Sequence, residues 1–255
     1  MKVSVLVQAG YCLSYLFYYV SEFWLRRNSI EFTILFRFPL TVMEPDKKYR
    51  TLAEASLCSF AFMVFAFFIH FGFPLKLVSL SALVIASYIL SRQLQVLPDF
   101  WRKTGLYFNF NVSFLFSFAG IVSGILLAIF YRRHLGISLF PESIHCFVII
   151  AAVIGAVEEL VFRGFLQEQA RSINGPFSVV FSTISHTGYK CCLFLAPAAT
   201  ATIDIPNLAL WTFLFGLIFG TIRHLSRSIL PSLIAHSVFD IMVYAEFVKA
   251  PWWVW

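Results

Sequence analysis

Long apolar runs separated by short polar segments dominate the sequence. A run of about 20 apolar residues has the length that crosses the hydrocarbon core of a bilayer as an α-helix. We therefore expect eight membrane-spanning helices, the third short enough to be re-entrant instead, at residues 3–21, 56–73, 77–91, 106–131, 144–162, 177–198, 206–222 and 228–247. The pattern predicts an all-α, polytopic transmembrane helical bundle.

The composition also favours a membrane protein. Of the 255 residues, 60% are hydrophobic and only 13% are charged, whereas soluble domains carry about 25% charged residues. The net charge of +6 requires no nucleic acid, because lysine and arginine gather in the cytoplasmic loops of membrane proteins. The five cysteines include no Cys-x-x-Cys pair, so neither a disulfide framework nor a cysteine metal site is indicated. We expect residues 1–255 to form a single integral membrane domain.

Basic residues suggest how the predicted helices are oriented. The loop after the first predicted span is rich in lysine and arginine, which places it in the cytoplasm. Alternating from that loop places further basic residues on the same side of the membrane, namely Arg92, Arg102, Lys103, Arg171, Arg223 and Arg227. Arg132 and Arg133 fall on the opposite side.

Two adjacent carboxylates, Glu158 and Glu159, stand at the end of the apolar run 146–157. Charged groups at membrane depth are costly unless they face a partner or a wet cavity, so such a cluster indicates function. Glu159 and Arg163 are four residues apart, which predicts an ion pair on one helix face. Glu158 is rotated by about 100° and has no partner on its own helix. We expect Glu159 to be structural, Glu158 to be free for chemistry, and Arg163-Gly164 to close the helix at the aqueous boundary.

Two later predicted spans carry further ionisable groups. The sixth contains His186, and the eighth contains His236 and Asp240 on one helical face. Carboxylates and imidazoles together can activate water or bind zinc. A single intramembrane histidine more often hydrogen-bonds a neighbouring helix, so His186 alone decides little. Small residues four apart predict close helix packing, at Gly120/Gly124, Ala151/Gly155 and Gly216/Gly220.

The order and spacing of these polar groups resemble the CPBP family of intramembrane endopeptidases. This family includes the type II CAAX prenyl proteases and bacterial Abi-type proteins. The matching motifs, on separate helices, are Glu158-Glu159-x-x-x-Arg163-Gly164, His186 and His236-x-x-x-Asp240. Residues 215–236 are similar to the family's last motif block. The resemblance covers a core of about residues 145–245, whereas residues 1–140 carry no recognisable motif.

The resemblance implies an eight-helix type of bundle around a polar cavity in the membrane. Glu158 and His186 would activate a water molecule that attacks a peptide carbonyl. His236 and Asp240 would stabilise the resulting oxyanion. The supporting residues would be Glu159 and Arg163.

Two positions depart from the family's pattern. Ser182 stands four residues before His186, where the family usually has an aromatic residue, and Asp240 stands where it usually has asparagine. A carboxylic acid donates a hydrogen bond only when protonated. Asp240 could therefore donate to the oxyanion as an acid, orient His236 as an anion, or belong to a metal site.

We expect an intramembrane endopeptidase of glutamate type that needs no cofactor. Zinc is the alternative, with Glu158, His186 and His236 as its ligands. The expected partners are the lipid bilayer and a hydrophobic or lipidated protein, with prenylated CAAX proteins, bacteriocin precursors and lipoproteins all compatible. The bacterial breadth of the family points to the plasma membrane of a prokaryote. The alternatives are a proteolytically inactive binding or immunity protein of the same fold and a proton-coupled transporter.

Overall fold

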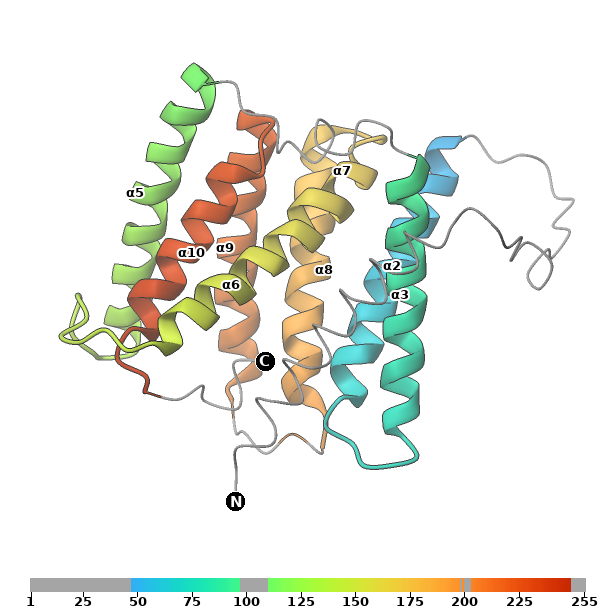
Figure 1. Ribbon diagram of the computed structural model, residues 1–255, viewed down its shortest axis with the longest axis horizontal. Coiled ribbons are helices and arrows are strands. Elements are labelled where there is room, and N and C mark those ends of the chain that lie inside the picture. Colours follow the sequence, from blue (N-terminus) through green and yellow to red (C-terminus); the bar gives the residue numbers. More distant parts are fainter. Residues whose placement is uncertain (1–46, 97–109, 198, 200–202, 249–255) are drawn as a thin grey trace, which may run out of the picture. The chain divides into compact units, whose positions relative to one another are not determined.

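The computed structural model describes residues 47–96, 110–197, 199 and 203–248, which belong to one compact unit spanning residues 45–255. Every regular element in these ranges is a helix, which confirms the all-α prediction (Figure 1). The helices are α2 (Lys47–Phe68), α3 (Lys76–Val96), α5 (Phe110–His134), α6 (Phe147–Glu159), η1 (Leu160–Leu166), α7 (Gln167–Ala170), α8 (Gly175–Leu195), α9 (Ile205–Ser226) and α10 (Leu230–Tyr244).

Three of the described helices are long and apolar enough to cross a membrane: Tyr49–Phe68, Phe114–His134 and Ile205–Ser226. They expose many large apolar side chains, as lipid contact requires. The other predicted spans in this part of the chain are helices as well, but shorter or less apolar. The predicted span at residues 3–21 lies outside the described residues. The structure therefore supports an integral membrane protein with three candidate spans among the described residues, and the count of eight stays a prediction.

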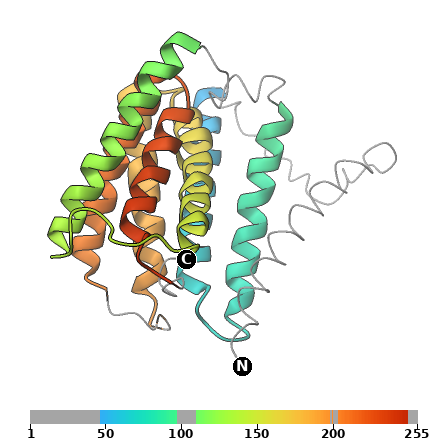
Figure 2. The same ribbon diagram turned by 60° about the vertical axis from the view of Figure 1, so that its left-hand side comes forward.

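The C-terminal helix α10 packs against three others: α5, α6 and α9. Figure 2 shows α10 lying between α5 and α6. Helix α8 packs against α9 on one side and α2 on the other, and α2 in turn packs against α3. The predicted motif helices α6, α8 and α10 are thereby brought together with α9.

Glycines allow α5 and α10 to approach closely. A methyl group on Gly120 would collide with the carbonyl oxygen of Pro231, and one on Gly124 with that of Ala235. Both contacts lie on the first turns of α10, just before His236. The predicted role of this glycine pair in helix packing is confirmed, and the packing fixes where His236 enters the bundle.

The prediction that Arg163-Gly164 closes its helix at the aqueous boundary is wrong. After Glu159 the chain continues through the π-helical turn η1 into α7, and both Arg163 and Gly164 are buried. Buried side chains contact the arginine at Nη1 in place of water, and Gly164 leaves room for the side chain of Ile229. Short π-helical turns inside α-helices are often found at functional sites.

Candidate active site

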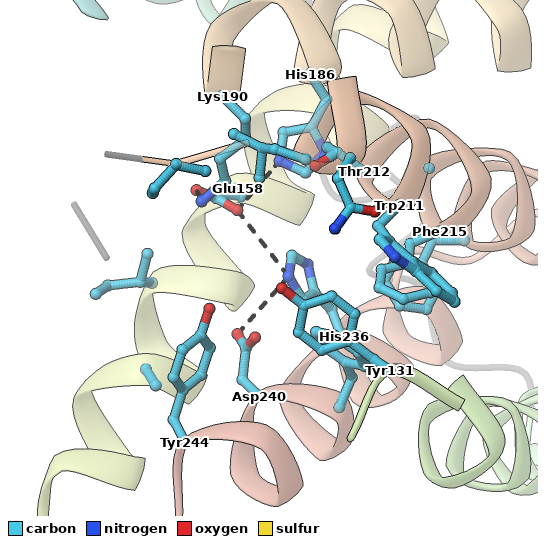
Figure 3. A pocket seen from close by; sticks show the side chains of 18 of the residues that line it. Tyr131, Glu158, His186, Lys190, Trp211, Thr212, Phe215, His236, Asp240 and Tyr244 are labelled. Atoms are coloured by element: carbon cyan, nitrogen blue, oxygen red, sulfur yellow. Dashed lines mark hydrogen bonds and ion pairs between the residues drawn. The ribbon is translucent and has the colours of Figure 1, made fainter. Parts of the chain in front are cut away.

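A cavity of about 640 Å³ opens among α5, α6, α8, α9 and α10 (Figure 3). One part of its lining is aromatic, namely Tyr131, Trp211, Phe215, Phe219, Phe239 and Tyr244. Another part consists of charged residues and histidines, namely Glu158, Arg163, His186, Lys190, Asp204, His236 and Asp240. All four residues predicted to be catalytic therefore line one cavity, although they come from three helices.

The predicted ion pair between Glu159 and Arg163 is confirmed. Arg163 Nη1 lies 3.5 Å from Glu159 Oε1, and both side chains are fully buried. The pair survives the π-helical turn that begins at Leu160. Because each charge would be strongly unfavourable alone in the interior, the two depend on one another.

Arg163 also determines where His186 carries its proton. Arg163 Nη1 lies 2.9 Å from His186 Nδ1, and a guanidinium can only donate. His186 Nδ1 must therefore accept, so the imidazole is neutral with its hydrogen on Nε2. That hydrogen is donated to Glu158 Oε2, 3.1 Å away. The ring of Phe162 covers the imidazole at a centroid distance of 4.6 Å.

Glu158 has partners from α8, although it has none on its own helix. His186 donates to Oε2, and the Lys190 ammonium forms an ion pair with Oε1. The sequence analysis missed Lys190. The spacing could have indicated Lys190, since it follows His186 by four residues and therefore lies on the same face of α8.

His236 is held by Glu159 rather than by Asp240. His236 Nδ1 donates to Glu159 Oε1 at 3.1 Å, since that carboxylate is paired with Arg163 and accepts. His236 Nε2 then points between Glu158 Oε2 at 4.0 Å and Asp240 Oδ2 at 3.7 Å. Both distances exceed that of a hydrogen bond. Glu159 thus connects Arg163 to the ring that faces the cavity.

The two positions that depart from the family's pattern have distinct surroundings. The Ser182 hydroxyl donates to the carbonyl of Val179 at 3.1 Å and contacts Gln167, while Phe162 supplies an aromatic ring to His186. Asp240 lies against Gly155, where a methyl group would collide with its Oδ2. The predicted packing glycine therefore also makes room for this carboxyl group.

The positions of the carboxylates and imidazoles in the cavity indicate whether they could bind a metal ion. In the described ranges, no group of three histidine, cysteine, aspartate or glutamate side chains is arranged to hold a metal ion. In the set Glu158, His186 and His236, the hydrogen on His186 Nε2 occupies the lone pair that a metal would need. The ammonium of Lys190 adds a competing cation at Glu158. In this arrangement the side chains of Glu158, His186 and His236 do not fit a zinc site.

The segment that carries this site matches the sequence model of a known family. Residues 140–242 match the sequence model of a family described as "Type II CAAX prenyl endopeptidase Rce1-like". The match includes every charged residue of the cavity lining named above. Comparisons with curated proteins and with solved structures give no significant match.

Proposed function

We propose that this chain, which carries an Rce1-like type II CAAX prenyl endopeptidase (CPBP) family domain at residues 140–242, is an intramembrane endopeptidase of glutamate type. The observation that carries the proposal is the position of Glu158. Its carboxylate is buried beside the imidazoles of His186 and His236, which come from two other helices, and it lines the cavity. Such a group can take a proton from water inside a bundle that shields the reaction from bulk solvent.

Glu158 is the proton acceptor in this mechanism. It accepts a hydrogen bond from His186 and forms an ion pair with the Lys190 ammonium, and is therefore ionised. A water molecule beside Oε2 loses a proton to Glu158 as its oxygen attacks the peptide carbonyl. His186 cannot take this proton in the arrangement described, because Nε2 already carries one. It holds the carboxylate in place, and Glu158 later returns the proton to the leaving amine.

His236 and Asp240 supply donors to the oxyanion. Among the described residues, His236 Nε2 has no hydrogen-bond partner closer than the two carboxylates already measured, so it is available to the substrate when protonated. Asp240 Oδ2 lies 3.7 Å from this nitrogen, beyond hydrogen-bond distance, which favours a protonated Asp240 that donates to the oxyanion directly. Donors placed where charge develops stabilise the transition state more than the ground state. The mechanism uses no metal.

The substrate fits the apolar part of the cavity. Aromatic side chains of α5, α9 and α10 face it, and the surrounding helices expose apolar surface suited to lipid. We take a membrane-associated protein ending in a prenylated CAAX sequence as the substrate, in keeping with the family's description. Bacteriocin precursors and lipoproteins are the alternatives. We place the enzyme, with eight spans, in a prokaryotic plasma membrane.

The test uses the full chain in lipid nanodiscs and a fluorescent farnesylated CAAX peptide. Wild-type protein should cleave the peptide, and Glu158→Gln should abolish turnover while binding persists. Glu142→Gln is the matched control, because Glu142 is exposed on the loop before α6. Binding without cleavage by the wild type would instead identify a proteolytically inactive binding protein. Elemental analysis, with activity measured after chelation, tests the absence of a metal, and stoichiometric zinc whose removal stops cleavage would contradict it.

A further inference from the structure

Lys190 lines the cavity and contacts Glu158 directly, yet it has no chemical step in the mechanism above. It lies near the end of α8, one turn after His186, and its side chain is 20% exposed. A lysine this close to a helix end could extend to the membrane surface. Its ammonium instead turns into the cavity and pairs with Glu158 Oε1 (Figure 3).

We infer that Lys190 is a positioning residue for the proposed reaction, and that it aims the carboxylate of Glu158. The inference rests on the proposed function. Helix α8 contacts both oxygens of this carboxylate, with Lys190 on Oε1 and His186 on Oε2. Two donors on different oxygens fix the rotation of the carboxylate plane. Oε2 is thereby kept beside both histidines, at 3.1 Å from His186 Nε2 and 4.0 Å from His236 Nε2.

The charge of Lys190 matters as well as the position of its ammonium. The titratable and charged groups that interact with Glu158 are His186, Tyr189 and Lys190 from α8, and His236, Asp240 and Tyr244 from α10. Glu159 is the next residue on α6. Arg163, the nearby arginine, is committed to Glu159 and to His186 Nδ1. Lys190 is therefore the permanent cation that offsets the negative charge of Glu158 in a site where three carboxyl groups gather.

The experiment compares wild-type protein, Lys190→Met and Lys190→Arg in nanodiscs with the farnesylated CAAX peptide. In Lys190→Met we expect kcat to fall by about 10–100-fold while KM stays nearly constant, because a misaimed base slows chemistry without weakening binding. Lys190→Arg should recover part of kcat, since it restores the cation with a different shape. Lys76→Met is the control, because Lys76 is exposed at the start of α3.

A pH profile separates positioning from a merely structural role. Without the cation, ionised Glu158 is less favoured, so the acid limb of kcat/KM should move to higher pH in Lys190→Met and return toward wild type in Lys190→Arg. If Lys190→Met does not fold, Lys190→Gln, which keeps a donor without the charge, is carried through the same assays and should show the same shift.

The possible failures are distinct. A folded Lys190→Met or Lys190→Gln protein with wild-type kcat and an unmoved acid limb would overturn the role of Lys190, provided that the wild type cleaves the peptide. A wild-type protein that does not cleave it would overturn the proposed function instead.

Discussion

Two buried arginines, Arg132 and Arg163, solve the same physical problem in different ways. Both side chains are fully buried in a bundle whose outer surface is apolar. Arg132, in the last turn of α5, donates to the carbonyl oxygens of Ser138 at 2.6 Å and Met242 at 2.8 Å, and also reaches Glu246 at 3.2 Å. It ties the loop after α5 to the end of α10, and backbone carbonyls do not titrate.

The observed partners of Arg163 are both titratable side chains, whereas Arg132 has backbone carbonyls besides Glu246. Arg163 pairs with Glu159 and donates to His186, while its Nε and Nη2 have no hydrogen-bond partner among the described residues. Its surroundings are therefore less well satisfied than those of Arg132. Arg163 determines which nitrogen of His186 carries the proton and, through Glu159, helps to orient the ring of His236. The difference shows that Arg132 holds two segments of the backbone together, whereas Arg163 determines which nitrogen of His186 carries the proton.

Replacing Arg163 should have the largest effect. Arg163→Ala leaves Glu159 as an unpaired buried anion, which we expect to lower the free energy of unfolding by about 3–5 kcal/mol. It also frees His186 to move its proton to Nδ1, so activity per folded molecule should fall as well. Thermal unfolding in detergent and peptide cleavage measure the two effects. Arg171→Ala is the control, because its pair with Glu168 is partly exposed and should contribute little.

The proposed role of Arg163 in setting the proton of His186 would be contradicted if Arg163→Ala lost stability but kept full activity per folded molecule. The separate role of Glu158 in catalysis would be contradicted if Glu158→Gln, which should leave stability nearly unchanged, proved as destabilising as Arg163→Ala.

Replacing Arg132 should separate stability from activity. Arg132→Ala removes donors from several carbonyl oxygens, and we expect a loss of about 1–3 kcal/mol. Water can reach part of this loop, since the side chain of Glu246 is 31% exposed, so the loss should be smaller than for Arg163→Ala. Activity per folded molecule should remain near that of the wild type. Arg133→Ala, at the exposed neighbouring position, should change neither, and a selective loss of kcat in Arg132→Ala would contradict the distinction.

The same two arginines show what could be predicted from the sequence. The Glu159–Arg163 pair was predictable because both partners lie on one helix at a fixed spacing. The gathering of Glu158, His186 and Asp240 followed from a motif pattern on three helices. The partners of Arg132 were not predictable, since backbone carbonyls of a distant loop have no sequence signature. Its burial also explains why it violates the expected distribution of loop charges.

Contacts between helices were the harder part of the site. The ion pair of Lys190 with Glu158 and the hydrogen bond of His236 to Glu159 depend on how α8 and α10 are rotated against α6. No spacing within one helix determines such rotations. The π-helical turn from Leu160 to Leu166 was also not predicted.

Asp240→Asn tests whether residue 240 acts on the substrate or on His236. If a protonated Asp240 donates to the oxyanion, the amide should replace it, keep or raise activity at neutral pH and flatten the alkaline limb of the pH profile. The distance of 3.7 Å between Asp240 Oδ2 and His236 Nε2 favours this outcome. A large loss of activity at neutral pH, in a protein with unchanged thermal unfolding, would show that the negative charge of Asp240 is needed.

The smallest effect is expected at Glu246, beside Arg132. The backbone N–H of Glu142 donates to its carboxylate at 2.8 Å and, together with Arg132, holds the pKa of Glu246 below its ordinary value of 4.5. Because the pKa is lower in the folded state, ionised Glu246 stabilises the fold above the ordinary pKa. That contribution is lost as the pH falls through the lowered pKa.

Glu246→Gln removes the charge at every pH and so measures this contribution directly. The wild type should have the higher unfolding temperature at neutral pH, and its advantage over Glu246→Gln should shrink as the pH falls below 4.5. Glu142→Gln is the matched control, because it keeps the backbone N–H that Glu246 accepts and changes only a weak side-chain contact of 3.5 Å with Ser138. If the difference in unfolding temperature stayed constant with pH, the carboxylate of Glu246 would act through its shape and not its charge. The stability of the region around Arg132 would then not depend on the protonation of Glu246.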